Sequence, residues 1–346
     1  MKTTNQKGEN ETVRASRMKY IVRAVLLLLL AVSLFVYRDT LRDIAEGIRD
    51  VTWTEMGIGI LLAFLGYLME GLTIYVMMGT VSPRARARDG IFIAYACEFY
   101  RLATLGNGSG IAEIHYLHEK GVEPGSATVL TMIQYVMKRT AIMLAGLAGF
   151  VSLYNKEATR GLCREYILFL AAGCLITVII IASFLCIVML PGVTEFLSGM
   201  LDRLAVRFRP QKDNFSKWKE QLLLLNRSGK TILGQKKRMC CVTALQVGKL
   251  LSFYLIPTIF LYGEAGLGAA ECVWIMAVAF MLAGVIPAPS GAGALEFVFL
   301  LFFGHFTKAG TAVPAVLFFR FATWLWPAVV GGLLLWTRRI FPFRES

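Results

Sequence analysis

The sequence lacks the residue patterns that identify most enzymes and metal proteins. Its seven cysteines occur in no Cys-x-x-Cys or Cys/His ligand spacing, so neither a disulfide framework nor a zinc site is indicated. No Ser/His/Asp or Cys/His arrangement and no glycine-rich phosphate loop is evident. We therefore expect no catalytic residue, no metal and no cofactor, and we interpret most of the cysteines as small apolar packing residues.

Charged residues are also scarce, which excludes an ordinary soluble domain. Asp, Glu, Lys and Arg make up 17% of the 346 residues, whereas 56% of the residues are hydrophobic and the mean hydropathy is +0.61. Several apolar runs approach the roughly 20 residues that an α-helix needs to cross a bilayer. The sequence therefore predicts an all-α fold, that of a polytopic helical membrane protein.

Six apolar runs are long enough to be full spans, and two further regions are interrupted. The predicted full spans are residues 20–37, 56–81, 128–154, 166–190, 240–262 and 314–337. The interrupted regions are residues 89–112, broken by LGNGSG, and 273–304, broken by PAPSGAG. Irregular backbone at membrane depth is tolerated only where it is buried in protein or lines a wet cavity. We therefore expect both breaks to meet in an interior, hydrated site.

Lysine and arginine are distributed unevenly between the connecting segments, and this asymmetry predicts the topology. Basic residues collect on the cytoplasmic side of membrane proteins. Segment 1–19 has five, the loop SPRARARD three, segment 191–238 eleven and the C-terminal TRRIFPFRES three. All four face the cytoplasm only if each interrupted region enters and leaves on one side. We therefore predict two re-entrant hairpins within a transmembrane domain over residues 20–337, with cytoplasmic tails at 1–19 and 338–346.

A short pattern recurs after each interruption. The sequence GIAE, which ends at Glu113, is followed 26 residues later by Arg139, and GALE, which ends at Glu296, is followed 24 residues later by Arg320. Because the two regions enter from opposite sides, the copies would form an inverted repeat, an architecture that places a substrate site near the midplane between broken helices. Chance is the alternative, since glycine and glutamate are common and there are only two copies.

The two arginines of this pattern are the strongest candidates for substrate binding. An ionised side chain at the bilayer centre costs about 2.5–3.5 kcal/mol, so such residues usually face the bundle interior and pair. Arg139 and Arg320 lie within apolar surroundings, and a guanidinium binds phosphate through a bidentate fork. Glu113 and Glu296 either contribute to the same site or only neutralise the arginines and cap the half-helices.

The second break adds backbone groups to this candidate site. Ser290, Gly291 and Gly293, together with two prolines, interrupt the helix. Backbone N–H groups at the start of the next half-helix are thereby freed, and its positive dipole end favours an anionic phosphate. We expect Glu296 to hold Arg320 when the site is empty and to receive a cationic headgroup when it is full.

Other charges within the apolar regions have two interpretations. Glu98 and Arg101 are three residues apart, so they either join the substrate site or satisfy each other on one helical face. We interpret Lys138 and Lys249 as snorkelling residues, and Glu70 as the partner of one of them.

Two further features suggest ligands but have simpler explanations. His115 and His118 form a His-x-x-His pair, but no third metal ligand follows at a recognisable spacing. The basic segment 191–238 contains FLSGMLDRLAVRF, with apolar residues at helical spacing. An amphipathic helix on an anionic cytoplasmic leaflet explains both properties, so we expect no nucleic-acid partner.

Three stretches carry a resemblance to a known family. The run PAPSGAGALE, the later LFFRFATWLWPAVVGG and the earlier MKR within a span resemble the transmembrane domain of lysylphosphatidylglycerol synthases, also called the flippase-like family. The resemblance extends over residues 20–337 and is more specific in its second half. In the first half, the Pro and Arg that the family often carries around its first motif are replaced by LGNGSGIAEIHY.

The resemblance implies a lipid translocase of the bacterial cytoplasmic membrane. Its substrate would be an anionic or aminoacylated phospholipid, namely aminoacylated phosphatidylglycerol, moved from the inner to the outer leaflet. Such transport would contribute to resistance against cationic antimicrobial peptides.

The resemblance leaves the enzymatic role open. Full-length members also carry a soluble domain that transfers an aminoacyl group from tRNA to the lipid. This chain ends at Ser346 without one, so we expect it to be non-catalytic. Two alternatives are the membrane part of a phosphatidylglycerol lysyltransferase with a separate aminoacyl transferase as partner, and a translocase of another glycolipid or polyprenyl-linked substrate. Homo-oligomerisation is a further open possibility.

Overall fold

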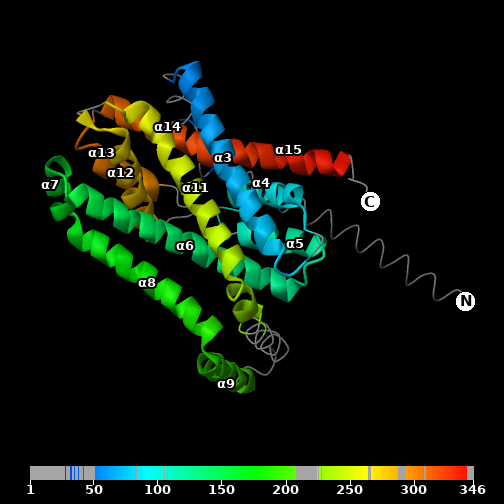
Figure 1. Cartoon of the computed structure of the whole chain (residues 1–346). Coiled ribbons are helices and arrows are strands. Elements are labelled where there is room, and N and C mark those ends of the chain that lie inside the picture. The colour runs from blue at the N-terminus through cyan, green and yellow to red at the C-terminus, as the bar shows by residue number, and fades with distance from the viewer. Residues whose placement is uncertain are drawn as a thin grey trace, which may run out of the picture.

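The computed structural model describes most of the chain as helices. The described ranges are residues 51–82, 85–104, 106, 108–207, 224, 226, 228–263, 266–286, 293–307 and 309–340, with five isolated positions between 28 and 42. Within these ranges no strand occurs (Figure 1). The helices are α3 (Trp53–Met78), α4 (Ala87–Ala103), α5 (Ser109–Glu119), α6 (Pro124–Tyr154), α7 (Glu157–Glu165), α8 (Ile167–Met189), α9 (Pro191–Arg207), α11 (Lys236–Leu261), α12 (Ala269–Ala283), α13 (Ala294–Phe303), α14 (Ala309–Arg320), the π-helix η4 (Phe321–Leu325) and α15 (Trp326–Ile340).

Five of the six predicted full spans are confirmed. α3, α6, α8, α11 and the continuous segment Thr311–Arg338 are long and apolar enough to cross a membrane. The sixth predicted span, 20–37, falls almost entirely outside the described residues. Helix boundaries differ from the predicted ones by a few residues because polar first turns precede the apolar runs. α3, for example, begins with a capping box between Thr52 and Glu55.

The first interrupted region forms a helical hairpin of α4 and α5, which we call the first hairpin. The helices separate at residues 104–108, the first break, where the Gly108 N–H donates to Thr104 Oγ1 at 2.6 Å. At the open end of the hairpin, Lys120 Nζ lies 2.8 Å from Asp89 Oδ1. Gly121, at a φ of +82°, then turns the chain into α6. The start of α4 and the end of α5 therefore lie side by side.

The second interrupted region forms a second hairpin of α12 and α13. The break between these helices runs from residue 284 to 293, and residues 287–292 lie outside the described part of the chain. At the open end, Glu271 forms an ion pair with Lys156, and His305 Nε2 lies 3.8 Å from Glu165 Oε2. Both helices of this hairpin thus meet the connection between α6 and α8.

The two hairpins open at opposite ends of α6. The first opens beside the start of this helix and the second beside its end, and a helix of 31 residues is about 46 Å long. Figure 1 shows the same arrangement, with α5 and α9 at one end of the molecule and α7 and α13 at the other. The inverted-repeat prediction requires such opposed openings.

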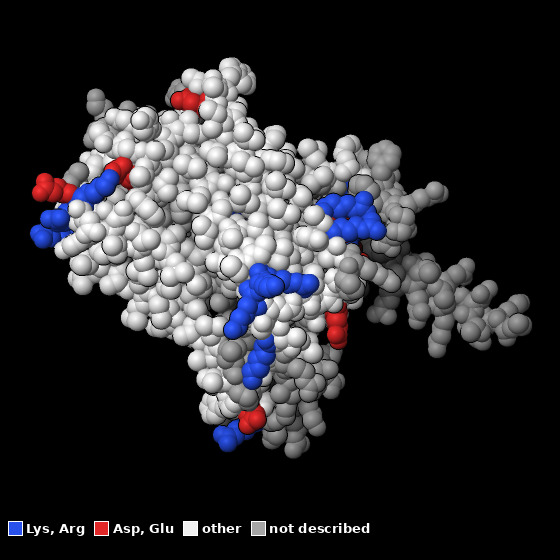
Figure 2. Space-filling view, in the orientation of Figure 1, with Lys and Arg blue, Asp and Glu red and all other residues white. Residues whose placement is uncertain are grey.

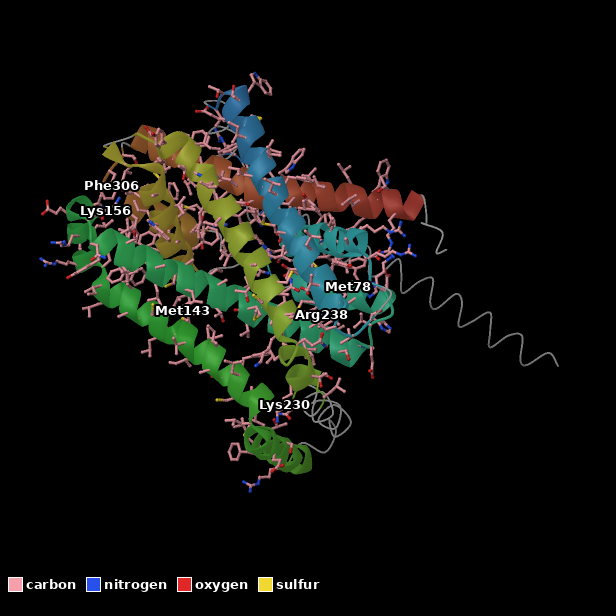
Figure 3. The ribbon with its side chains drawn as sticks, viewed as in Figure 1. Met78, Met143, Lys156, Lys230, Arg238 and Phe306 are labelled. Atoms are coloured by element: carbon pink, nitrogen blue, oxygen red, sulfur yellow. The ribbon has the colours of Figure 1, made fainter. Side chains whose placement is uncertain are left out.

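Charged side chains collect at these two ends. Figure 3 labels Lys156 and Phe306 at the end where the second hairpin opens, and Arg238 and Lys230 at the other. In the same orientation, Figure 2 shows charged residues near these positions and a largely uncharged surface between them. We call the end with Arg238 and Lys230 the basic end, because the described part of the loop after α3, beside Arg86 and Arg88, and the start of α11 both lie there. This separation of charge is expected of a protein that crosses a bilayer.

Close packing of α3 brings the two halves of the chain together. α3 lies against α4 and α11, and a Cβ atom on Gly90 of α4 would collide with the carbonyl oxygen of Gly71 on α3. Small residues at such crossings let helix backbones approach closely in membrane proteins. The contact places interior side chains of α3, α4 and α11 within reach of one another.

The amphipathic helix predicted after residue 191 is present as α9. Its Phe196 and Met200 side chains are exposed, as expected of a helix that rests on a membrane surface. The basic residues between positions 208 and 223 lie outside the described part of the chain.

Candidate functional site

An ion pair beside the second break dominates the second half of the molecule. Arg320 Nε donates to Glu296 Oε1 at 2.6 Å and Arg320 Nη2 to Glu296 Oε2 at 2.6 Å. Glu296 lies in the first turn of α13, and Arg320, only 9% exposed, is the last residue of α14. Such a bidentate pair lets both charges stay within an apolar bundle, because each group satisfies the other. The predicted pairing is therefore present.

The helix changes its geometry directly after this pair. Residues Phe321–Leu325 form the π-helix η4, and Tyr67 of α3 donates a hydrogen bond of 2.7 Å to the carbonyl oxygen of Thr323 within it. π-Helical turns are rare and frequently mark functional sites. The Tyr67 hydroxyl is nearly inaccessible and ties the region next to Arg320 to the neighbouring α3.

Arg139 also reaches the second break, although it belongs to the first copy of the repeated pattern. Its Nη1 donates to the carbonyl oxygen of Gly284, the C-cap of α12, at 3.1 Å, and its Nε donates to Tyr135 Oη at 3.1 Å. No ion pair joins Arg139 to Glu113 among the described residues, so the suggested neutralisation of Arg139 by Glu113 is wrong. The reason is geometric, since α6 directs Arg139 toward the second hairpin. Arg139 therefore contacts the end of α12 before the second break, and Arg320 contacts the start of α13 after it.

A second polar group lies between α3 and α11. Lys249 Nζ is 2.9 Å from Glu70 Oε2, and Gln246 Nε2 donates to the same oxygen at 3.1 Å. Lys249 is 3% exposed and its ammonium lies 5.7 Å and 5.5 Å from the ring centroids of Tyr67 and Phe253. The prediction that Lys249 snorkels is therefore wrong, because its ammonium is held inside by a carboxylate and two aromatic faces. The predicted partnership of Glu70 with a lysine is confirmed.

The first break contributes the remaining charges. Arg101 Nη2 lies 3.1 Å from Glu98 Oε1, so these residues form an ion pair, while Glu98 Oε2 is buried without a hydrogen-bond partner among the described residues. In α5, Glu113 Oε1 is buried without a hydrogen-bond partner among the described residues. Lys138 and Lys249 lie within electrostatic range of Glu113. The carboxylate of the first copy therefore interacts electrostatically with Glu70 and with the two lysines, and not with the arginine of its own repeat.

These groups form one set, which we call the central charge cluster. Electrostatic interactions connect its pairs with one another and with Tyr67. Its members are Glu70, Glu98, Arg101, Glu113, Lys138 and Lys249. Three acidic and three basic side chains balance, so the cluster can exist inside an apolar bundle without a net charge.

The sequence only partly indicated this arrangement. Glu98, Arg101 and Glu113 lie in the central cluster, whereas Arg139, Glu296 and Arg320 lie at the second break. Gly293 starts α13 at a φ of +82°, and Ser290 and Gly291 lie outside the described residues.

Glu70, Lys138 and Lys249 are not among the predicted substrate-binding residues, although they belong to the central charge cluster. Glu70 lies well inside the apolar span α3, and Lys249 lies beyond the first turns of α11. Because a charge within an apolar span is costly, their positions alone indicate that both side chains face the interior of the bundle.

The arrangement suits a zwitterionic or anionic molecule with a polar head. Arg139 and Arg320 both contact residues near the second break, a guanidinium can donate several N–H groups to a phosphate, and Glu296 beside Arg320 can receive a cation. The described residues contain no cluster of three or more His, Cys, Asp or Glu side chains arranged to hold a metal ion.

Comparison with known proteins assigns the chain to a family. Residues 21–331 match the family model described as the lysylphosphatidylglycerol synthase TM region. No curated protein matches the chain. Since the match extends over most of the 346 residues, the chain belongs to the family of the lysylphosphatidylglycerol synthase transmembrane region.

Proposed function

We propose that this protein is a lipid flippase that moves aminoacylated phosphatidylglycerol from the inner to the outer leaflet of a bacterial cytoplasmic membrane. The family supports a membrane function related to lysylphosphatidylglycerol. The observation that carries the proposal is the buried, bidentate Glu296–Arg320 pair at the second break, with Arg139 at the end of α12 before that break. Burying such a pair within an apolar bundle costs free energy, and ionisable residues at such positions commonly have a function.

The pair supplies a binding mechanism by exchange of partners. In the empty site, Glu296 and Arg320 compensate each other. When a phosphate enters, the Arg320 fork can transfer to its oxygens, while the freed Glu296 accepts the cationic aminoacyl group. Arg139 adds a second guanidinium. Exchange avoids the large cost of an uncompensated buried charge, because every charge gains a new partner as it loses the old one.

The central charge cluster extends the polar interior toward the first break. Its three acidic and three basic groups offer further sites where a headgroup with both charges can exchange partners. A lipid with phosphate and ammonium groups fits such an alternating lining better than a purely anionic one. Release into the outer leaflet would raise the positive charge of the cell surface, which accounts for a contribution to resistance against cationic peptides.

The test is transport in reconstituted vesicles. The full chain is reconstituted with a fluorescent lysylphosphatidylglycerol in the inner leaflet, and its appearance outside is followed by a membrane-impermeant quencher. We expect transport to exceed that of protein-free vesicles and to fall strongly in Arg320→Ala and Glu296→Gln. Arg320→Lys should restore only part of it, because an ammonium lacks the planar fork.

The matched control is Glu271→Gln, which breaks the ion pair with Lys156 at the end of the molecule and not in its interior. It should transport like the unaltered protein. Equal rates with and without protein would refute the proposal. Transport of a glycolipid or polyprenyl-linked lipid in place of lysylphosphatidylglycerol would favour a different substrate class.

A further inference from the structure

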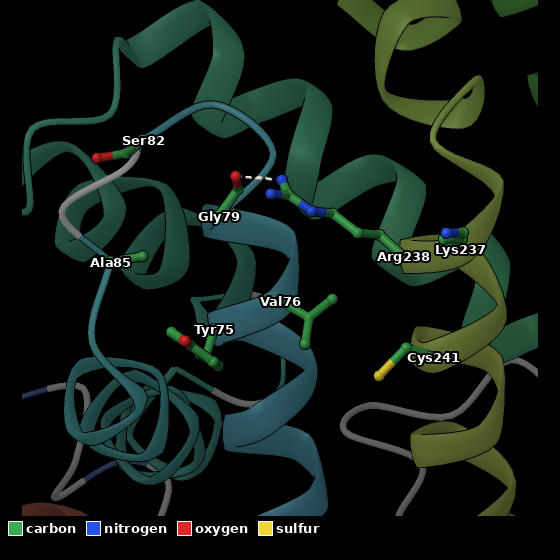
Figure 4. A pocket seen from close by; sticks show the side chains of 8 residues that line it. All are labelled: Tyr75, Val76, Gly79, Ser82, Ala85, Lys237, Arg238 and Cys241. Carbon is green, nitrogen blue, oxygen red and sulfur yellow. Dashed lines mark hydrogen bonds between the residues drawn. The ribbon is translucent and has the colours of Figure 1, made fainter.

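A cavity at the basic end lies outside the interior sites described above. It lies between the end of α3 and the start of α11, and its volume is about 400 Å³ (Figure 4). This volume is within the range of about 300–1,000 Å³ that is typical of ligand pockets. The residues that matter for its chemistry are Tyr75, Val76, Gly79, Lys237, Arg238 and Cys241.

The charge on the cavity wall is positive. Lys237 and Arg238 both line it, and no lining residue is acidic. Among the described residues, no carboxylate forms an ion pair with either side chain. Arg238 extends from α11 and donates a hydrogen bond to the carbonyl oxygen of Gly79, the C-cap of α3 (Figure 4). A guanidinium has five N–H groups, so this bond leaves others for a ligand.

The position of these cations is unfavourable for the helix that carries them. Lys236, Lys237 and Arg238 occupy the first turn of α11, which contains no acidic residue. Positive charges at a helix N-terminus oppose the helix dipole. Arg238 is offset by the Gly79 carbonyl at the negative end of α3, but Lys237 has no comparable partner among the described residues. An anion in the cavity would compensate Lys237.

The cavity is amphipathic in the way that a phospholipid is. Its cations lie at the start of α11, whereas Val76 and Cys241 belong to the membrane spans α3 and α11. Farther along α11, Val247 and Leu251 expose apolar side chains. A phosphate at Lys237 would therefore leave an attached acyl chain free to lie along the spans. A soluble anion would contact only the cations at the start of α11 and not the apolar side chains of the spans.

We propose that this cavity binds the phosphate headgroup of an anionic phospholipid from the leaflet beside the basic end. Lys237 would contact the phosphate, and Arg238 would contribute an N–H group while it stays bound to Gly79. The inference concerns binding alone and does not depend on whether the protein transports lipid.

Binding to the purified full chain in detergent tests this proposal. The probes are short-chain phosphatidylglycerol, short-chain phosphatidylcholine and inorganic phosphate. We expect phosphatidylglycerol to bind more tightly than phosphatidylcholine, and Lys237→Gln to weaken it about tenfold, as loss of a hydrogen bond to a charged group predicts.

Lys236→Gln is the control, because it removes the same charge from the same turn but does not line the cavity. Its affinity should stay within about twofold of the unaltered protein. Unchanged affinity in Lys237→Gln would overturn the proposal. Inorganic phosphate that binds as tightly as the lipid would overturn it as well, since the site would then be one for a free anion.

Two neighbouring cysteines provide a second test that needs no substitution. Cys240 and Cys241 are both exposed, but only Cys241 lines the cavity. Short-chain phosphatidylglycerol should slow alkylation of Cys241 by a maleimide and leave Cys240 unchanged, as measured by fragment mass spectrometry. Equal protection of both thiols, or of neither, would contradict the assigned site.

Discussion

The two hairpins share one sequence pattern and differ in their chemistry. In the second hairpin, each carboxylate oxygen of Glu296 accepts one hydrogen bond from Arg320. In the first, Glu113 has a buried oxygen without a hydrogen-bond partner among the described residues, and its nearby cations are Lys138 and Lys249. A repeated break and carboxylate can therefore produce one bidentate ion pair and one buried carboxylate that forms no ion pair among the described residues. We infer that the two hairpins contribute different parts of one polar interior.

The anchoring of the hairpins differs as well. The first is closed by the pair of Asp89 and Lys120 and is attached to α15 through Glu119 and Arg338, whereas the second is attached to the connection between α6 and α8 through Lys156 and Glu165. Arg139 of α6 also binds the second break. The second hairpin is thus held by the connection between α6 and α8 at its open end and by α6 at its break.

The largest effect on stability is expected from Arg320→Ala. This change leaves Glu296 without its bidentate partner inside the bundle, and removal of one member of a buried pair costs about 3–5 kcal/mol. The free energy of unfolding in mixed micelles measures the loss. A change below about 1 kcal/mol would place the pair in a far more hydrated environment than its burial indicates.

A somewhat smaller loss is expected from Lys249→Met. Glu70 would lose its ammonium partner but keep the hydrogen bond from Gln246, so we expect a cost of about 3 kcal/mol. Adding Glu70→Gln should recover much of this loss, because no uncompensated charge then remains. Additive losses in the double variant would show that the two residues do not act as a pair.

Tyr67→Phe should have a modest effect. The substitution removes the hydrogen bond to the Thr323 carbonyl oxygen and preserves the ring, which corresponds to about 1 kcal/mol. Because the bond lies next to Arg320, transport should fall as well if the π-helix helps to position that residue. Tyr262→Phe, at the exposed end of α11, is the control and should leave transport unchanged.

Glu113→Gln sharpens the comparison of the hairpins most directly. Since Glu113 forms no ion pair among the described residues and its Oε1 has no hydrogen-bond partner there, we expect a loss of stability of at most about 1 kcal/mol, well below that of Arg320→Ala. Transport should nevertheless fall, because the amide cannot accept a cation as a carboxylate does. A loss of stability as large as that of Arg320→Ala would mean that the two carboxylates have the same structural role.

Much of the fold followed from local properties of the sequence. Apolar runs predicted five spans that the structure contains, and glycine and proline marked both breaks, because neither continues a helix easily. The Glu296–Arg320 pair was also predictable, since Glu296 near the start of α13 and Arg320 at the end of α14 meet when these consecutive helices pair across a short turn.

Contacts between distant helices were not predictable in the same way. Arg139 binds Gly284, which is 145 residues away, and Gln246 binds Glu70 across 176 residues. No pattern in the neighbouring sequence indicates either contact, because each contact depends on how closely α3 packs with α11 and α6 packs with α12. The rule that buried charges pair predicted that partners exist, but only the packing determined which residues they are.

The central claim is that the Glu296–Arg320 pair exchanges partners with the lipid headgroup. The double variant Glu296→Gln with Arg320→Met tests it, because this variant removes both charges and leaves neither residue uncompensated. Stability should recover relative to Arg320→Ala, and Glu271→Gln again provides the transport control. In vesicles that contain lysylphosphatidylglycerol, we predict that the double variant is folded but transports at the rate of protein-free vesicles. Transport at the rate of the unaltered protein would contradict the account and leave the pair with a structural role alone.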